Sequence, residues 1–145
     1  WSKVNGFINM IKLLIASHDR MASGMKASAE FFTGPCQRLT ALDAYLDEQD
    51  FETQVRAYLA RQAETDIILF LSDLYGGSVN QIMTRVMSER KNIRLICGFN
   101  FPLLLELIEW NEACLSDEQL DSMMEQARES LRRVVLKNTE AEEFF

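Results

Sequence analysis

Four short apolar runs, each followed by polar residues and then by a segment of helical periodicity, constrain this chain more than any other feature. The runs cover residues 11–16, 39–45, 67–71 and 93–97. Apolar runs of this length are typical of strands that are covered on both faces. Parallel strands need crossover helices, and right-handed crossovers place those helices on both faces of the sheet. The pattern therefore predicts an α/β fold with an open, mostly parallel sheet of four strands and helices on both faces.

The segments between the runs have apolar residues at spacings of three and four, which is the period of an amphipathic helix. These segments begin near Met21, Phe51, Ser78 and Leu103. A last helix is predicted from Ser116, because Ser116 and Gln119 have the spacing of a capping box. We expect its buried stripe to contain Leu120, Met123, Met124, Ala127 and Leu131. Residues 134–136 either extend this helix or form a short fifth strand.

The length of 145 residues indicates one domain, large enough to bury a core without metals or disulfides. We assign residues 10–137 to this domain. Residues 1–9 are set apart as a candidate leader or expression segment, and residues 138–145 as an acidic, flexible tail. No linker divides the domain.

Charge and hydropathy disfavour several classes of function, and the cysteines indicate a compartment. Fifteen Lys and Arg against 22 Asp and Glu give a net charge of −7, which repels nucleic-acid phosphates and anionic lipids. No apolar run approaches the roughly 20 residues that cross a bilayer, so we expect no insertion into a membrane. Cys36, Cys97 and Cys114 are odd in number and lack CxxC spacing, which indicates packed thiols in a reducing cytoplasm.

The single histidine of the chain, His18, directly follows the first apolar run. In open α/β sheets, ligands bind at the carboxyl ends of the strands, where the strand order reverses. If the first and third strands are neighbours, His18 faces Asp73 and Ser78 across this point. A carboxylate that accepts a hydrogen bond from one imidazole nitrogen leaves the lone pair of the other free as a nucleophile.

Donors for an anion follow the third strand. Glycines let the backbone approach phosphoryl oxygens, and a hydroxyl at a helix N-terminus lies where the helix dipole favours negative charge. We therefore predict a phosphoryl-acceptor site whose catalytic residues are His18 and Asp73. The predicted phosphoryl-binding residues are Ser78, Gly76, Gly77 and Ser17.

Other chemistries lack the residues they need. Ser, His and Asp are present, but the G-x-S-x-G motif of a serine hydrolase is not. A metal site would need more than one histidine together with carboxylates, and the sequence shows no such cluster, so we expect neither a metal nor another cofactor. From spacing alone, plainer roles stay open: His18 as a hydrogen-bonding surface residue, Asp73 as a turn residue and Ser78 as an N-cap.

Three motifs occur in order along the chain. They are LLIASH with MASGM in residues 13–25, LSDLYGGS in residues 71–78 and GFNFPLLLE in residues 98–106. With these motifs the chain resembles the mannose-family enzyme IIA of the bacterial phosphoenolpyruvate-dependent sugar phosphotransferase system, over most of residues 10 to 136. The resemblance implies that His18 takes a phosphoryl group from the phosphocarrier protein HPr and passes it to enzyme IIB. It also implies that Asp73 orients His18 and that Ser78 helps to bind the phosphoryl group.

The resemblance further implies a cytoplasmic phosphotransferase component for sugar uptake, which works with the membrane components IIC and IID. It implies a homodimer in which a C-terminal strand crosses to the partner's sheet, and residues 134–136 stand where that strand would be.

The chain departs from the family pattern at two places. Asp19 stands where the family usually has glycine, and it adds a negative charge beside the phosphoryl acceptor. Val79 and Gln81 replace the proline and asparagine that are common at the following helix start. Two alternatives stay open: a phosphotransfer subunit for dihydroxyacetone kinase, whose glycine turn differs, and a regulatory interaction domain with little turnover, which Asp19 suggests.

Overall fold

Four parallel strands form one sheet in the order β2-β1-β3-β4 in the computed structural model, which describes residues 11–136. The strands are β1 (Lys12–His18), β2 (Leu39–Ala44), β3 (Ile68–Ser72) and β4 (Ile93–Cys97). Leu14 of β1 pairs with Thr40 on one side and with Phe70 on the other. The sheet is the predicted one, and the adjacency of the first and third strands puts the reversal of strand order between β1 and β3.

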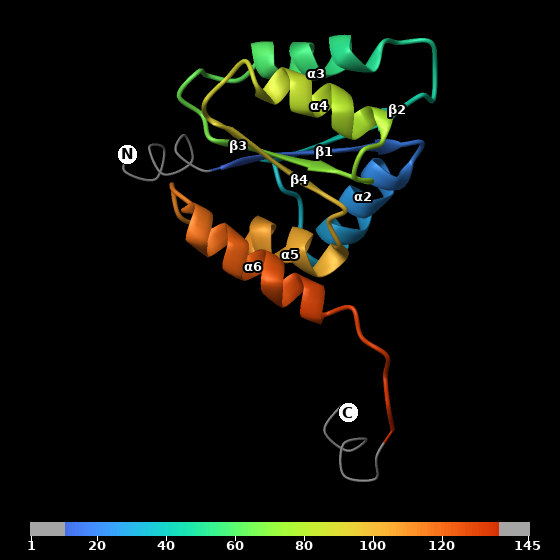
Figure 1. Cartoon of the computed structure of the whole chain (residues 1–145), viewed down its shortest axis with the longest axis vertical. Helices are drawn as coiled ribbons and strands as arrows, with labels where there is room; N and C mark the ends of the chain where they lie inside the picture. Colours follow the sequence, from blue (N-terminus) through green and yellow to red (C-terminus); the bar gives the residue numbers. More distant parts are fainter. Residues whose placement is uncertain (1–10, 137–145) are drawn as a thin grey trace.

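Helices cover both faces of the sheet, as predicted (Figure 1). One face carries α3 (Phe51–Ala60) and α4 (Ser78–Met87). The other face carries α2 (Met21–Thr33), α5 (Phe101–Glu109) and α6 (Asp117–Glu129). The right-handed crossovers of parallel strands produce this division.

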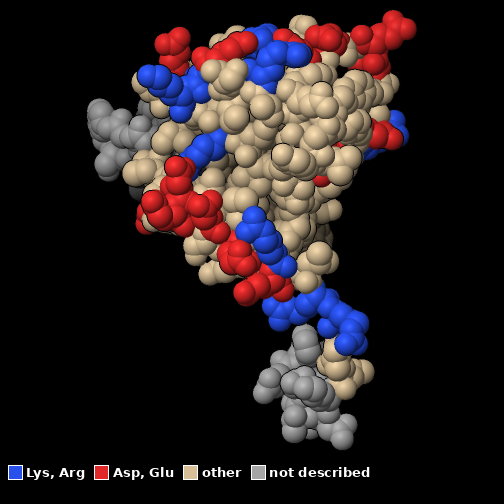
Figure 2. Space-filling model, in the orientation of Figure 1, with Lys and Arg blue, Asp and Glu red and all other residues tan. Residues whose placement is uncertain are grey.

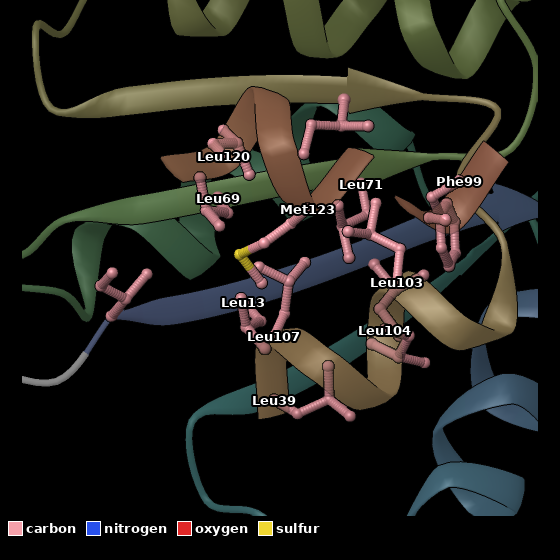
Figure 3. Close-up of a cluster of buried hydrophobic side chains, with 14 of the residues drawn as sticks. Leu13, Leu39, Leu69, Leu71, Phe99, Leu103, Leu104, Leu107, Leu120 and Met123 are labelled. Carbon is pink, nitrogen blue, oxygen red and sulfur yellow. The ribbon is translucent and has the colours of Figure 1, made fainter. Parts of the chain in front are cut away.

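Two hydrophobic cores lie on the two faces of the sheet. Side chains alternate along β1, so Leu13 enters the core under α5 and α6, whereas Leu14 enters the core under α3 and α4. Figure 3 shows the first of these cores, which contains Leu69 and Leu71 of β3 together with Leu107 of α5. Both faces of β3 are buried along its whole length, which explains the unbroken apolar run of residues 67–71.

Side-chain caps fix the starts of three helices. Asp50 accepts a hydrogen bond from the backbone N–H of Thr53, and Asn100 accepts one from Leu103. At Ser116 both hydrogen bonds of the predicted capping box with Gln119 are formed. Each cap satisfies backbone donors that have no partner within the helix.

Three predictions about side-chain burial need correction. Leu131 is 88% exposed, because α6 ends at Glu129 and Leu131 lies beyond the buried stripe. Met124 is only partly buried at the edge of the core. Cys114 is exposed and does not pack as predicted, since it lies in the loop before α6, while Cys36 and Cys97 are partly buried.

Residues 132–136 neither extend α6 nor form a strand within this single chain. A strand exchanged in a dimer needs a second sheet to pair with, so it stays a prediction. The predicted leader at residues 1–9 and the acidic tail at 138–145 lie outside the described residues. Within the described range, no helix has the length and apolar character needed to cross a membrane.

Candidate functional site

The carboxyl ends of β1 and β3 bring His18 and Asp73 together. Oδ2 of Asp73 accepts a hydrogen bond from the backbone N–H of His18 at 2.8 Å. The same oxygen lies 2.7 Å from Nδ1 of the imidazole. One carboxylate oxygen thus fixes both the strand end and the ring.

Asp73 is an ionised acceptor at neutral pH. Burial raises its pKa, since its side chain is only 11% exposed, but the hydrogen bonds from the backbone and ring of His18 lower the pKa more. The pKa of Asp73 therefore lies below its ordinary value. An ionised carboxylate can only accept, so Nδ1 of His18 carries the proton in this hydrogen bond.

The other ring nitrogen of His18 faces Ser78. Nε2 lies 3.0 Å from Oγ of Ser78. With the proton of a neutral ring on Nδ1, Nε2 is an acceptor, and the Ser78 hydroxyl donates to it. The side chain of His18 is 41% exposed, so a reactant can reach this nitrogen from solvent.

Ser78 is the first residue of α4 rather than its N-cap. Gly77 occupies the cap position in an extended conformation and makes no side-chain cap. The hydroxyl of Ser78 therefore lies at the positive end of the helix and is free to bond outside it. The plainer role of Ser78 as an N-cap is thereby corrected.

The two predicted glycines form the turn between Asp73 and Ser78. Gly76 has a φ of 76°, which glycine adopts without steric cost. The side-chain amide of Gln81 donates to the carbonyl oxygen of Gly76 at 2.7 Å. Gln81 thus connects the glycine turn to the first turn of helix α4. Gly77 lies directly against the imidazole of His18.

Ser17 does not join the other predicted phosphoryl-binding residues. Its side chain is fully buried. Its Oγ donates to the carbonyl oxygen of Asp19 at 3.1 Å and accepts from the backbone N–H of Ala22 at 2.7 Å. Neighbouring residues of a strand point to opposite faces, so Ser17 serves the start of α2 while His18 faces α4.

Tyr45 belongs to the site although it was not among the predicted site residues. Its hydroxyl donates to Oγ of Ser78 at 2.8 Å, and its ring centroid lies 5.4 Å from that of His18. Tyr45 directly follows β2, whose last residue, Ala44, pairs with His18. Its position after a strand adjacent to β1 was the signal that could have identified it.

Asp19, which departs from the family pattern, has a φ of 55°. Its backbone N–H donates to the carbonyl oxygen of Ala44 at 3.0 Å, and its side chain is exposed. Glycine adopts this left-handed conformation freely, and Asp tolerates it better than most residues. The chain therefore keeps the glycine-type backbone while adding a charge next to His18.

Two further observations bear on the chemistry. Among the described residues, no group of three or more His, Cys, Asp or Glu side chains could hold a metal ion. Acidic and basic side chains intermingle over α3 and α4 in Figure 2, so this part of the surface has no basic patch of the kind that binds nucleic acid. The arrangement at His18 is that of an oriented nucleophile beside donors for an anion.

Comparison with known proteins agrees with this chemistry. The family model EIIA-man, described as "PTS system fructose IIA component", matches residues 12–132. The PTS system mannose-specific EIIAB component of Escherichia coli K12 is 27% identical over 134 residues, which cover 90% of this chain and 41% of the relative. The chain thus spans about two fifths of the length of this relative. The PTS system fructose-specific EIIA component of Bacillus subtilis is 23% identical over 85% of this chain and 86% of the relative.

Solved structures share the fold. The PTS IIA protein associated with the fucose utilization operon of Streptococcus pneumoniae superimposes with a TM-score of 0.75 at 27% identity, covering 86% of this chain and 93% of that one. The mannose/sorbose-specific IIA subunit of Enterococcus faecalis gives a TM-score of 0.74 at 20% identity, covering 89% and 98%. The four-stranded sheet with helices on both faces is therefore the architecture of these IIA proteins.

Proposed function

This chain belongs to the EIIA-man family of the phosphotransferase system, and on that premise we propose that it is a phosphohistidine carrier that works through His18. It accepts the phosphoryl group from HPr and passes it to a sugar-specific enzyme IIB during sugar uptake. The observation that carries the proposal is the pair of contacts on one ring: Nδ1 lies 2.7 Å from the Asp73 carboxylate, and Nε2 lies 3.0 Å from the Ser78 hydroxyl.

The proposed reaction is a displacement at phosphorus. The lone pair of Nε2 attacks the phosphoryl group of the donor phosphohistidine, a new N–P bond forms, and the donor's N–P bond breaks. The ring of His18 keeps its proton on Nδ1 and becomes cationic. The ionised carboxylate of Asp73 stabilises that positive charge at 2.7 Å, in a place where it is shielded from solvent.

Ser78 and the turn before it receive the transferred group. As the phosphoryl group arrives on Nε2, the Ser78 hydroxyl turns its proton from Nε2 to a phosphoryl oxygen. The positive end of α4 favours the added negative charge. Gly77, which has no Cβ, lets the backbone lie against the ring at this point.

Onward transfer uses the same nitrogen. Nε2 is the reactive atom in both steps, so HPr and enzyme IIB would occupy the surface around His18 in turn. Exposed apolar side chains flank the site residues in sequence and offer contact area to both partners: Met21, Leu46, Leu74 and Tyr75. A cytoplasmic location, a homodimer and work with membrane components IIC and IID belong to the same proposal.

The direct test is phosphorylation by purified components. The protein is incubated with phosphoenolpyruvate, enzyme I and HPr, and the mass gain of one acid-labile phosphoryl group is measured. We expect the gain on the natural chain and its loss in His18→Ala. Absence of the gain on the natural chain, or its persistence in His18→Ala, would contradict the proposal.

A regulatory interaction domain is the second candidate, and the charge of Asp19 beside His18 favours it. Such a domain would be phosphorylated slowly and would not pass the group on. Chase of the phosphorylated protein with a purified enzyme IIB of the mannose family separates the two candidates. Rapid loss of phosphoryl from His18 to that enzyme IIB supports the carrier, and retention supports the regulatory domain.

A further inference from the structure

We propose that Tyr45 is a positioning residue that acts on His18 through the hydroxyl of Ser78. Three groups form one chain of hydrogen bonds at the surface. The Tyr45 hydroxyl donates to Oγ of Ser78 at 2.8 Å, and that Oγ lies 3.0 Å from Nε2 of His18. The consequence for phosphoryl transfer rests on the proposed function, whereas the hydrogen-bond chain itself does not.

The donor and acceptor roles in these hydrogen bonds follow from the contact between Asp73 and His18. Asp73 is ionised and accepts a hydrogen bond from Nδ1–H, so Nε2 is the acceptor and Ser78 the donor. A serine hydroxyl has one proton and two acceptor lone pairs. Because Ser78 gives its proton to Nε2, it can only accept from Tyr45, which agrees with the observed contact.

Tyr45 has an unusual backbone conformation that burial of its side chain does not explain. Tyr45 has a φ of 68°, which is unusual for a residue with a large side chain. Its side chain is 53% exposed, so core packing does not account for this conformation. The conformation brings the ring beside the imidazole at a centroid distance of 5.4 Å and the hydroxyl onto Ser78. Backbone strain of this kind clusters at functional sites.

Donation from Tyr45 would have two effects on Ser78. It occupies one lone pair of Oγ, which restricts rotation of the Ser78 hydroxyl and orients its proton toward Nε2. It also polarises the O–H bond, which makes Ser78 a stronger donor to Nε2 and later to a phosphoryl oxygen. Without Tyr45, the exposed hydroxyl of Ser78 would exchange between His18 and water.

The hydrogen-bond chain can be tested on the unphosphorylated protein. Because His18 is the only histidine, two-bond 1H–15N spectra of the untagged chain contain a single imidazole. We expect Tyr45→Phe to move the Nε2 resonance toward the value of a ring nitrogen without a hydrogen bond. In a Ser78→Ala background, Tyr45→Phe should cause no further movement. An unchanged resonance in Tyr45→Phe, or equal movements in both backgrounds, would overturn the proposal.

The second measurement is the rate of phosphoryl transfer from phosphorylated HPr. We expect Tyr45→Phe to slow acceptance roughly threefold to tenfold, the range that the loss of one hydrogen bond produces. The slowing should disappear in the Ser78→Ala background, a dependence that a merely structural role of the ring would not give. Tyr58→Phe is the matched control, because Tyr58 lies in α3 outside the site and its buried hydroxyl has no hydrogen-bond partner among the described residues.

The two measurements separate the two proposals. If the natural chain takes no phosphoryl group from HPr, the proposed function fails, while the Nε2 resonance still decides whether Tyr45 acts through Ser78. If the natural chain is phosphorylated and Tyr45→Phe matches it in rate, the positioning role is refuted and the carrier function stands.

Discussion

A methyl group on Gly77 would press against the imidazole of His18. An ideal Cβ at Gly77 lies 3.3 Å from Cε1 of His18, which is closer than an ordinary van der Waals contact. The same Cβ lies 3.4 Å from the carbonyl oxygen of Leu74, so it would also be in close contact with the backbone of the turn. The absence of a side chain at position 77 therefore leaves the ring room to hold its hydrogen bonds on both nitrogens.

We therefore expect Gly77→Ala to tilt the ring away from Ser78 and slow phosphoryl acceptance roughly tenfold, since small misplacements of reacting atoms reduce rates strongly. The fold should persist, because Gly77 has an ordinary negative φ of −68°. Gly24→Ala on α2 is the control, since a Cβ there meets nothing within 4 Å. Rates from phosphorylated HPr are compared, and equal rates for Gly77→Ala and the natural chain would contradict the expected steric conflict.

Asp73→Asn tests the charge of the carboxylate beside the imidazole. The amide oxygen can still accept from the backbone N–H and the Nδ1–H of His18, but the amide has no negative charge to stabilise the cationic ring that forms on phosphorylation. We expect phosphoryl acceptance to fall on the order of 10²-fold or more, as expected when a histidine loses its orienting carboxylate. Imidazole 15N spectra report the tautomer, and Asp121→Asn on α6 controls for the loss of a surface charge. An unchanged tautomer with an unchanged rate would refute this role of Asp73.

Asp73 also makes the free energy of unfolding depend on pH. Hydrogen bonds from His18 outweigh burial and hold the pKa of Asp73 in the folded chain below its ordinary value of 3.8. The stability that Asp73 contributes is therefore present above the pKa of the unfolded chain and is lost as the pH falls through the folded pKa. We expect the natural chain to lose stability below about pH 4 more steeply than Asp73→Asn, measured by urea unfolding between about pH 3 and pH 7. Parallel curves for the two proteins would exclude Asp73 as the source.

The architecture could be predicted because local patterns and tertiary packing agree. The five apolar residues of 67–71, bounded by Asp66 and by Ser72 and Asp73, are typical of a strand buried on both faces, and the Ser116 cap marks its helix without tertiary information. The C-terminus of α6 was harder to predict from the sequence, since neither glycine nor proline follows Glu129 directly. The apolar period then extended the predicted stripe to Leu131, which is exposed.

The candidate site was predictable only where strand order decides it. His18, Asp73 and Ser78 converge because β1 and β3 are neighbours. Ser17 lies apart from this group, since two successive side chains of a strand cannot both face α4, so its phosphoryl-binding role stays a prediction. Tyr45 depends on a left-handed backbone that intrinsic preferences do not predict for tyrosine, so its contact with Ser78 becomes visible only in three dimensions.

Ser17→Ala distinguishes a structural role from a phosphoryl-binding role. The buried Oγ of Ser17 accepts from the backbone N–H of Ala22 at 2.7 Å, and its loss leaves that donor unsatisfied at the start of α2. We expect the free energy of unfolding to fall by about 1–2 kcal/mol, with little change in phosphoryl acceptance. Urea unfolding and transfer rates are measured beside Ser122→Ala, an exposed serine of α6. A slowed transfer at unchanged stability would instead support the phosphoryl contact predicted from the sequence.

Two substitutions separate the effect of the Asp19 charge from the effect of its backbone conformation. Asp19→Asn removes the charge but keeps a residue that tolerates a φ of 55°, whereas Asp19→Gly also relieves the left-handed strain. If the charge opposes the arriving phosphoryl anion, both variants should accept phosphoryl a few-fold faster at low salt, and the advantage should shrink as salt screens the exposed carboxylate. Only Asp19→Gly should gain stability, by about 0.5–1 kcal/mol.

Rates from phosphorylated HPr at two salt concentrations, together with urea unfolding, measure both effects. Variants that match the natural chain at low salt would show that the Asp19 carboxylate does not impede transfer, which would remove the observation that favours a regulatory domain.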